Sequence, residues 1–222
     1  MIQLNKKIND GNKIPLTINT TCHFDPDIAY YSYNRKDGWR GCFGQAGSAQ
    51  RVLENNFVKE GDLFLFFGWF SECEYNNNKL SFKNRNGKHV LYGYLQIDKI
   101  IYPYKDEIPK WLEYHPHAKR GKKSHPQNCI YIAKKNCTFD NTLPGYGIFK
   151  YSPVLNLTKD GMTRSKWELP DIFREVSITY HNKKSWKDNY FQSACRGQEF
   201  VIEENDLIEN WAINIIKENA RR

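Results

Sequence analysis

The pattern of apolar and polar positions predicts strands over most of the chain. Two runs stand out, Leu63–Phe67 and His89–Tyr102, and both are rich in aromatic and β-branched residues. Because Leu63–Phe67 is apolar at every position, it is expected to be buried on both faces of a sheet. Gly93, inside the second run, predicts a bulge or the close approach of another backbone segment.

Three further strands are predicted, at Pro15–Cys22, Asn128–Ala133 and Gln198–Ile202. The first alternates apolar and polar residues and would deliver His23 at its end. The polar, Asn-rich segment 71–88 is expected to be a hairpin-type connection with a mobile tip. Pro144–Gly147 has the composition of a turn.

Apolar residues recur with helical spacing only in short segments. Ser48–Asn56 is predicted as a short helix and Leu169–Glu175 as a helical turn after Pro170. A terminal helix is expected to begin after Asn205, which is a favourable N-cap residue. Its apolar positions recur with helical spacing and are expected to face the core: Leu207, Ile208, Trp211, Ala212, Ile215 and Ile216.

These elements predict an α+β fold with a mixed, mostly antiparallel curved sheet, or a small barrel similar to the PUA-like class, with peripheral helices and a C-terminal amphipathic helix. No repeat or Pro/Ser-rich linker divides the sequence, so residues 1–222 are expected to form one domain. A barrel-like core is expected over about 15–135, with 136–222 packed against it. PUA-like domains include readers of modified bases, which is an argument from fold alone.

Composition adds information about the partner. The 222 residues include six Trp, 14 Tyr and 13 Phe, more than a core of this size needs, so some are expected to line a cleft or to stack on a ligand. The net charge of +8 favours an anionic partner, which is either a nucleic acid, with DNA preferred, or a nucleotide. The alternative is that genomic base bias alone produces this composition. The basic stretch 117–125 is predicted to be a loop that either grips phosphates or is merely solvated.

The cysteines and the apolar runs bear on the compartment. None of the six cysteines has C-x-x-C spacing, and neither a signal peptide nor an 18-residue apolar run is visible. We therefore expect reduced thiols, a cytoplasmic location and no membrane partner.

Candidate chemistry begins with the run His23-Phe24-Asp25-Pro26-Asp27, which places one imidazole and two carboxylates within five residues. His23, Asp25 and Asp27 are predicted as catalytic acid–base residues, because histidine titrates near neutrality and a carboxylate can orient it. The alternative is a solvated Asp-Pro turn.

The residues that come next in the chain can serve a substrate. Arginine provides a planar fork for phosphate, glutamine can read a base edge, and tryptophan can stack. An ordinary polar loop before a helix is the alternative for this segment. The candidate substrate-binding residues here are Trp39, Arg40, Gln45, Gln50 and Trp69.

Two later segments add candidates. His115-Pro116-His117 is predicted to contact phosphate or a base, or to be structural. No cysteine or paired carboxylate near it in the sequence completes a ligand set, so neither a metal nor another cofactor is predicted. Near the C-terminus the substrate-binding candidates are Arg164, Arg196, Gln198 and Glu199. The structural alternative for Arg196 and Glu199 is a buried ion pair between them.

Several of these motifs together resemble the third nucleotide-modification-associated domain family. They are His23-x-Asp25-Pro26-Asp27 with a following arginine, Gly61-Asp62, the aromatic strand ending at Phe67-Gly68, and Tyr92-Gly93-Tyr94-Leu95. The resemblance covers about the first hundred residues. Where the family pattern has a Tyr-Ala-Gly-like end, this chain has Phe67-Gly68-Trp69-Phe70, which indicates a divergent branch.

The family occurs in bacteria and phages in settings linked to altered DNA bases. The resemblance therefore implies a function on modified nucleotides, with phage defence as a context. It supports roles for His23, Asp25, Asp27 and Arg40, with Arg35 as a second candidate for the place of Arg40.

Three functions are hypotheses at this point. The first is an enzyme that acts on a modified base, nucleotide or nucleic acid, by metal-free hydrolysis or transfer at a glycosidic bond. The second is a non-catalytic reader of a modified or flipped base. The third is a basic protein–protein regulator.

Overall fold

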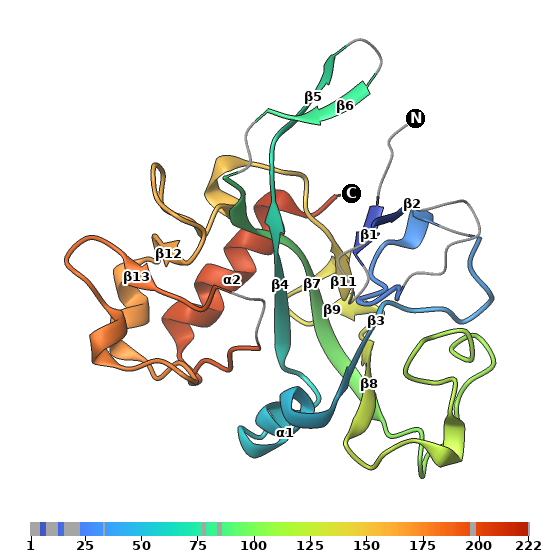
Figure 1. The fold of residues 1–222 in the computed structure, drawn as a ribbon. Coiled ribbons are helices and arrows are strands. Elements are labelled where there is room, and N and C mark those ends of the chain that lie inside the picture. The colour runs from blue at the N-terminus through green and yellow to red at the C-terminus, as the bar shows by residue number, and fades with distance from the viewer. Residues whose placement is uncertain are drawn as a thin grey trace.

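A curled antiparallel sheet forms the centre of the computed structural model, which describes residues 5–7, 13–15, 23–32, 34–76, 79–83, 86–195 and 199–221 (Figure 1). The sheet order is β11-β7-β8-β3, with β4 also paired to β7. Its strands are β3 (Cys42–Ala46), β4 (Leu63–Phe70), β7 (Lys88–Ile101), β8 (Asn128–Ala133) and β11 (Tyr146–Ile148). The expected α+β class is confirmed, and the curled sheet is a half-barrel. Its likeness to PUA-like barrels stays a prediction.

The long strand β7 joins the parts of the sheet, because it pairs with β4, β11 and β8. The register against β4 shifts beside Gly93: Phe66 pairs with Gly93 and Phe67 with Leu91, which leaves Tyr92 as the extra residue of a bulge. A Cβ at Gly93 would lie 2.6 Å from the carbonyl oxygen of Gly147. Both the bulge and the close approach predicted at this glycine are confirmed, and bulges of this kind bend a strand.

The segment that carries the His-x-Asp-Pro-Asp motif lies along the free edge of β3. The backbone N–H of Asp27 donates to the Cys42 carbonyl over 2.8 Å, and the Cys42 N–H donates back over 2.9 Å. Of the strand expected at Pro15–Cys22, only Pro15 lies in the described part, as the last residue of β2 (Lys13–Pro15). This strand pairs with β1 (Asn5–Lys7). Residues 16–22 lie outside the described residues.

Three apolar clusters form the core. The first joins the sheet to the C-terminal helix through Leu91, Tyr94, Ile208, Ile215 and Ile216, among others. The second joins β4, β7 and β8 and includes Phe66, Leu95, Ile97 and Tyr131. The third packs the connection between β7 and β8 onto the sheet through Leu112, Ala118, Ile130 and Ile132. This last packing fixes the loop that carries His115 and His117.

The burial predicted for β4 is wrong. Within its eight residues only Phe66 is buried, and Trp69 and Phe70 are exposed. Among the described residues β4 pairs with β7 alone, so it is an edge strand and its apolar side chains are covered only in part.

The two helices confirm their predictions. α1 (Gly47–Asn55) matches the expected Ser48–Asn56. α2 (Asp206–Asn219) begins after Asn205, whose side chain accepts hydrogen bonds from the N–H groups of Leu207 and Ile208. Of the predicted stripe, Ile208, Ala212, Ile215 and Ile216 are buried and Trp211 is half-buried, whereas Leu207 in the first turn is 61% exposed.

The remaining elements are short. β5 (Cys73–Asn76) and β6 (Lys79–Phe82) form a projecting hairpin, as expected for 71–88, and the tip at 77–78 lies outside the described residues (Figure 1). The turn predicted at Pro144–Gly147 bends the chain at Gly145. It separates β10 (Asp140–Pro144), which pairs with β9 (Asn136–Cys137), from β11. β12 (Lys166–Trp167) pairs with β13 (Phe191–Gln192). The turns of 3-10 helix are η1 (Tyr30–Ser32), η2 (Gly121–Lys123), η3 (Pro153–Leu155), η4 (Asp171–Glu175) and η5 (Lys183–Ser185).

Two segments near the C-terminus differ in their outcome. η4 confirms the helical turn after Pro170. The strand predicted at Gln198–Ile202 is wrong over its described part, because residues 199–202 contribute only an isolated bridge between Ile178 and Ile202.

Two further expectations concern thiols and membranes. The described cysteines, Cys42, Cys73, Cys129, Cys137 and Cys195, form no disulfide, and Cys22 lies outside the described residues. Neither helix in the described ranges has the length and apolar character needed to cross a bilayer.

Candidate functional site

Asp25 is held at the edge of β3 by the register of its neighbours. Because Asp27 pairs with Cys42 in antiparallel fashion, Asp25 lies opposite Gly44. The backbone N–H of Gly44 donates to Oδ1 of Asp25 over 2.9 Å. The Asp25 side chain is only 4% exposed, so this carboxylate is fixed by the sheet and shielded from solvent.

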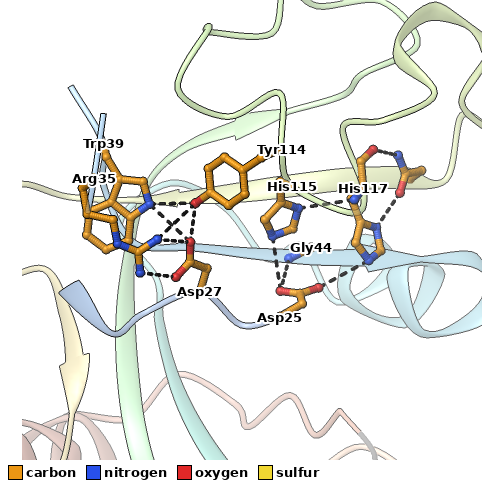
Figure 2. A network of polar contacts seen from close by, with 9 residues as sticks. Asp25, Asp27, Arg35, Trp39, Gly44, Tyr114, His115 and His117 are labelled. Carbon is orange, nitrogen blue, oxygen red and sulfur yellow. Dashed lines mark hydrogen bonds and ion pairs between the residues drawn. The ribbon is translucent and has the colours of Figure 1, made fainter. Parts of the chain in front are cut away.

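Two histidines from a distant loop meet this carboxylate (Figure 2). Nε2 of His115 lies 3.6 Å from Oδ1 of Asp25, and Nε2 of His117 lies 3.3 Å from Oδ2. A Cβ at Gly44 would lie 2.3 Å from Cδ2 of His117 and 2.9 Å from Cε1 of His115. Glycine at position 44 therefore makes room for both rings.

His23 completes the cluster from the solvent side. Its ring centroid lies 5.4 Å from that of His117, edge to face, and the side chain is exposed. His23, Asp25 and His117 each offer one possible ligand atom, and these three atoms lie within 4.8 Å of one another. The structure thus joins two predicted groups that are about ninety residues apart in the sequence and supplies the carboxylate that the His115-Pro116-His117 segment lacks locally.

Hydrogen bonds assign the tautomers of the two buried rings. The Asn128 amide nitrogen donates to the His117 carbonyl over 2.8 Å, so its oxygen accepts from Nδ1 of His117 over 2.6 Å. Nδ1 of His117 therefore carries a proton, and Nε2 is the basic nitrogen that faces Asp25. Nδ1 of His115 accepts from the His117 backbone N–H over 3.3 Å, so its Nε2 is the protonated nitrogen.

The charges in the cluster support one another. Burial opposes ionisation of Asp25, but His115, His117 and the Gly44 N–H together hold its pKa below the usual value. Burial also opposes protonation of His117, yet Asp25 and Asn128 raise its pKa. Nε2 of His115 is buried and makes no hydrogen bond, since 3.6 Å is too long for one.

Asp27 belongs to a separate network beside this cluster (Figure 2). Its carboxylate is fully buried and takes a bidentate pair from Arg35, with N–O distances of 2.6 and 2.8 Å. Tyr114 donates its hydroxyl proton to Asp27, and the indole N–H of Trp39 donates to the Tyr114 oxygen over 2.8 Å. Arg35 also lies 3.8 Å above the ring of Trp39. Because Tyr114 precedes His115, this network anchors the start of the histidine segment.

The other predicted residues lie in separate contacts. Gln45 donates to Glu199, so these two candidates meet. Arg164 lies 4.5 Å from the ring of exposed Trp69, which brings a second pair together. No contact described in the structured ranges joins Arg164 to Asp25.

Two predicted residues are taken up by structural contacts, and two lie outside the described residues. Arg40 pairs with Asp98, and Arg35 is the arginine that meets the motif. Gln50 is buried and accepts from the Tyr131 hydroxyl over 3.0 Å. Arg196 and Gln198 lie outside the described residues.

An aromatic cluster, part of the second apolar cluster of the core, lies next to this site. Its rings contact one another at centroid separations of 5.1 to 6.1 Å. The members are Phe43, Phe64, Phe66, Tyr92 and Tyr131. Burial, with the charge of Asp25 as a second cause, raises the pKa of Tyr92 to about 12. At least one ring of the aromatic cluster therefore lies close enough to Asp25 to be affected by its charge.

A basic loop comes directly after the histidines in the chain. It consists of Lys119, Arg120, Lys122 and Lys123, which line one hollow on the surface. All four side chains are exposed. The basic loop thus places four positive charges within six residues of His117.

Sequence reasoning missed three residues of the site. Gly44 and Asn128 act through space, on a ring that is distant in the sequence, so no local signal marks them. Tyr114 adjoins the His115-Pro116-His117 segment and could have been included on that ground alone.

Comparison with known proteins identifies the family. The sequence model of nucleotide modification associated domain 3 matches residues 2–203. The match extends well beyond the first hundred residues that carry the recognised motifs, and it therefore includes His115, His117 and the basic loop. Neither the comparison with curated proteins nor that with solved structures found a match. Because the family model covers most of its length, the chain belongs to the nucleotide modification associated domain 3 family.

Proposed function

We propose that this chain is an enzyme that acts on a modified base in a nucleotide or nucleic acid, by hydrolysis or group transfer at a glycosidic bond. The observation that carries the proposal is the convergence of His23, Asp25 and His117 on one point from two distant segments. Each contributes a basic atom that is not used up in holding the fold. Clusters of this kind at one point are typical of reactive centres.

The proposal gives the two carboxylates of the motif different roles. Asp25 is the carboxylate of the reacting centre. Asp27, buried and doubly paired with Arg35, is a positioning residue that holds Tyr114 and so the start of the histidine segment. Glycosidases that use two carboxylates keep both at the reacting bond, and here only Asp25 is at the centre. His117 takes the place of the second group.

Two neighbouring features suit a nucleotide substrate. Aromatic rings stack on a base without regard to its sequence, and the aromatic cluster lies beside Asp25. Lysine and arginine side chains bind phosphate, and the basic loop continues the histidine segment. The pairs Trp69–Arg164 and Gln45–Glu199 are proposed as outer contacts. The proposed partner is nucleic acid, and DNA is preferred over RNA. The proposed compartment is the cytoplasm.

The test is turnover of oligonucleotides and nucleosides that carry modified bases, followed by chromatography and mass spectrometry. Asp25→Asn and His117→Gln keep side-chain size and are expected to abolish product formation. Substrate affinity should stay within about tenfold of the unmodified chain, which is about 1.4 kcal/mol. His125→Ala, at an exposed histidine of the same loop, is the matched control and should turn over normally. Normal turnover by Asp25→Asn would contradict the proposal.

A reader of modified bases is the second candidate, and the half-buried rings of the aromatic cluster, Phe43, Phe64 and Tyr92, favour it because such rings can stack on an extruded base. A reader would bind one modified oligonucleotide more tightly than its unmodified form and never yield product. Tyr92→Leu would then reduce that preference, while Asp25→Asn would change affinity without any associated reaction.

A further inference from the structure

We propose that His23, Asp25 and His117 bind one divalent transition-metal ion of the Zn²⁺ type. The inference concerns the same site as the proposed function, but it is tested by metal binding and needs no substrate. The sequence predicted metal-free chemistry, because it does not show that His117 and Asp25 are close in space.

The separation of the donor atoms fits a shared metal ion better than a direct hydrogen bond. A charge-assisted N–H···O bond between imidazolium and carboxylate is about 2.7–2.9 Å long. The distance between His117 Nε2 and Asp25 Oδ2 is 3.3 Å. Two ligand atoms that each lie about 2.0–2.1 Å from a tetrahedral zinc ion are about 3.3 Å apart, so the observed spacing is that of neighbouring ligands.

The tautomer of His117 also calls for a cation at this point. Asn128 accepts the Nδ1 proton, which leaves the Nε2 lone pair directed at a carboxylate oxygen that also carries lone pairs. Two acceptors that face each other repel unless a proton or a metal ion lies between them, and the 3.3 Å separation is the one expected with a metal ion. His23 offers a third lone pair within 4.8 Å, and its exposed side chain can close that distance by a change of rotamer.

The surroundings of the two buried donors match the outer shell of known metal sites. A metal-binding histidine usually donates its other ring N–H to a carbonyl or carboxylate, and the Asn128 side-chain carbonyl has this role for His117. Oδ1 of Asp25 accepts from the Gly44 N–H, which leaves Oδ2 for a ligand. The buried Nε2–H of His115 lies 3.6 Å from Oδ1 of the same carboxylate, so its dipole stabilises the negative charge on Asp25.

The donor set selects the class of ion. Two imidazole nitrogens and one carboxylate suit Zn²⁺ or Fe²⁺, whereas Mg²⁺ and Ca²⁺ prefer oxygen ligands alone. Three protein ligands leave a coordination position for water or substrate, which is the arrangement of catalytic zinc sites. His23 lies on the solvent side, so this position would be reached from outside.

The experiment is calorimetric titration of the chelator-treated full chain with Zn²⁺, with Co²⁺ absorption as a report on the ligand set. One ion per chain is expected. His23→Ala, at an exposed residue, should fold normally and weaken binding by at least about tenfold, as should His117→Gln and Asp25→Asn. Asn128→Leu should weaken Zn²⁺ binding about 10–100-fold, because the Nδ1 proton of His117 loses its acceptor. His125→Ala should bind like the original chain, and Mg²⁺ should not compete.

Failure of this inference is separable from failure of the proposed function. Absence of Zn²⁺ binding, or binding that folded His23→Ala and His117→Gln proteins retain in full, would overturn the metal site. Full turnover by the metal-free chain in the presence of chelator would overturn it too, while leaving the proposed function intact. Stoichiometric Zn²⁺ binding that all four site substitutions weaken supports the metal site, whether or not any modified nucleotide is turned over.

Discussion

At the scale of residues, the site depends on the absence of a side chain at Gly44. This glycine lies in a strand, where its conformation is open to other residues, but any side chain would occupy the space of His117. The same glycine holds Asp25 through its N–H. One residue therefore sets the distance between the carboxylate and the imidazole on which both the proposed reaction and the proposed metal site depend.

Gly44→Ala is accordingly expected to displace the His117 ring and to lower both Zn²⁺ affinity and turnover by at least about tenfold, since ligand and reactant positions tolerate displacements of only about 0.5 Å. Gly68→Ala, in β4, is the matched control for metal binding, because a Cβ there meets the side chains of Phe70 at 3.0 Å and Tyr92 at 3.5 Å, and neither is a proposed metal ligand. Metal titration and thermal unfolding of both variants provide the measurement. Unchanged metal affinity in Gly44→Ala would show that the ring position is not decisive.

Among the elements, α2 stabilises the sheet through the first apolar cluster. Its buried stripe packs on Leu91 and Tyr94 of β7, and Asn205 satisfies two N–H groups at its first turn. This contribution is separate from the chemistry, because no residue of α2 contacts the site in the described structure.

Asn205→Ala should therefore lower the free energy of unfolding by about 1 kcal/mol, the usual cost of losing an N-cap. Asn205→Asp keeps the capping oxygen and should restore most of that loss. Denaturant unfolding measures both. Zn²⁺ affinity of the two variants should equal that of the original chain, and a change in it would mean that α2 and the site are coupled.

Across the whole molecule the net charge is +8, and four of the positive side chains lie together on the basic loop. The basic loop is attached to the same connection that carries His115 and His117, and the apolar cluster of Leu112 and Ala118 holds that connection on the sheet. A phosphate bound at the loop would thus lie close in the chain to the reactive centre. Long-range attraction by the remaining charges would act on association and would be screened by salt.

Lys119→Gln, Arg120→Gln and Lys123→Gln combined should weaken nucleic-acid binding and reduce the slope of log affinity against log salt concentration by up to about 2–3, since each lost phosphate contact removes about 0.7–0.9. The matched control removes three exposed lysines of a distant segment, Lys183, Lys184 and Lys187, by the same change. Binding titrations over a range of salt concentrations compare the two. Equal slopes in both would assign the effect to net charge rather than to the loop.

Most local elements could be predicted from neighbouring residues alone. Strand and helix periods, the N-cap at Asn205 and the bulge at Gly93 depend on the conformational preferences of neighbouring residues, and each was predictable. The His-x-Asp-Pro-Asp motif was likewise recognisable. Burial of β4 was not, because it depends on which strands lie beside it and not on its own apolar run.

The arrangement of the site follows from the folded chain alone. It assigned Asp25 to His115 and His117, and gave Asp27 to Arg35 and Tyr114, although the two carboxylates are two residues apart and equal in the sequence. The reason is geometric: the register of residues 23–29 on β3 fixes which carboxylate meets which loop residue, and that register involves residues far apart along the chain. Local preferences determine elements, whereas the position of a charge relative to its partners is a property of the folded chain.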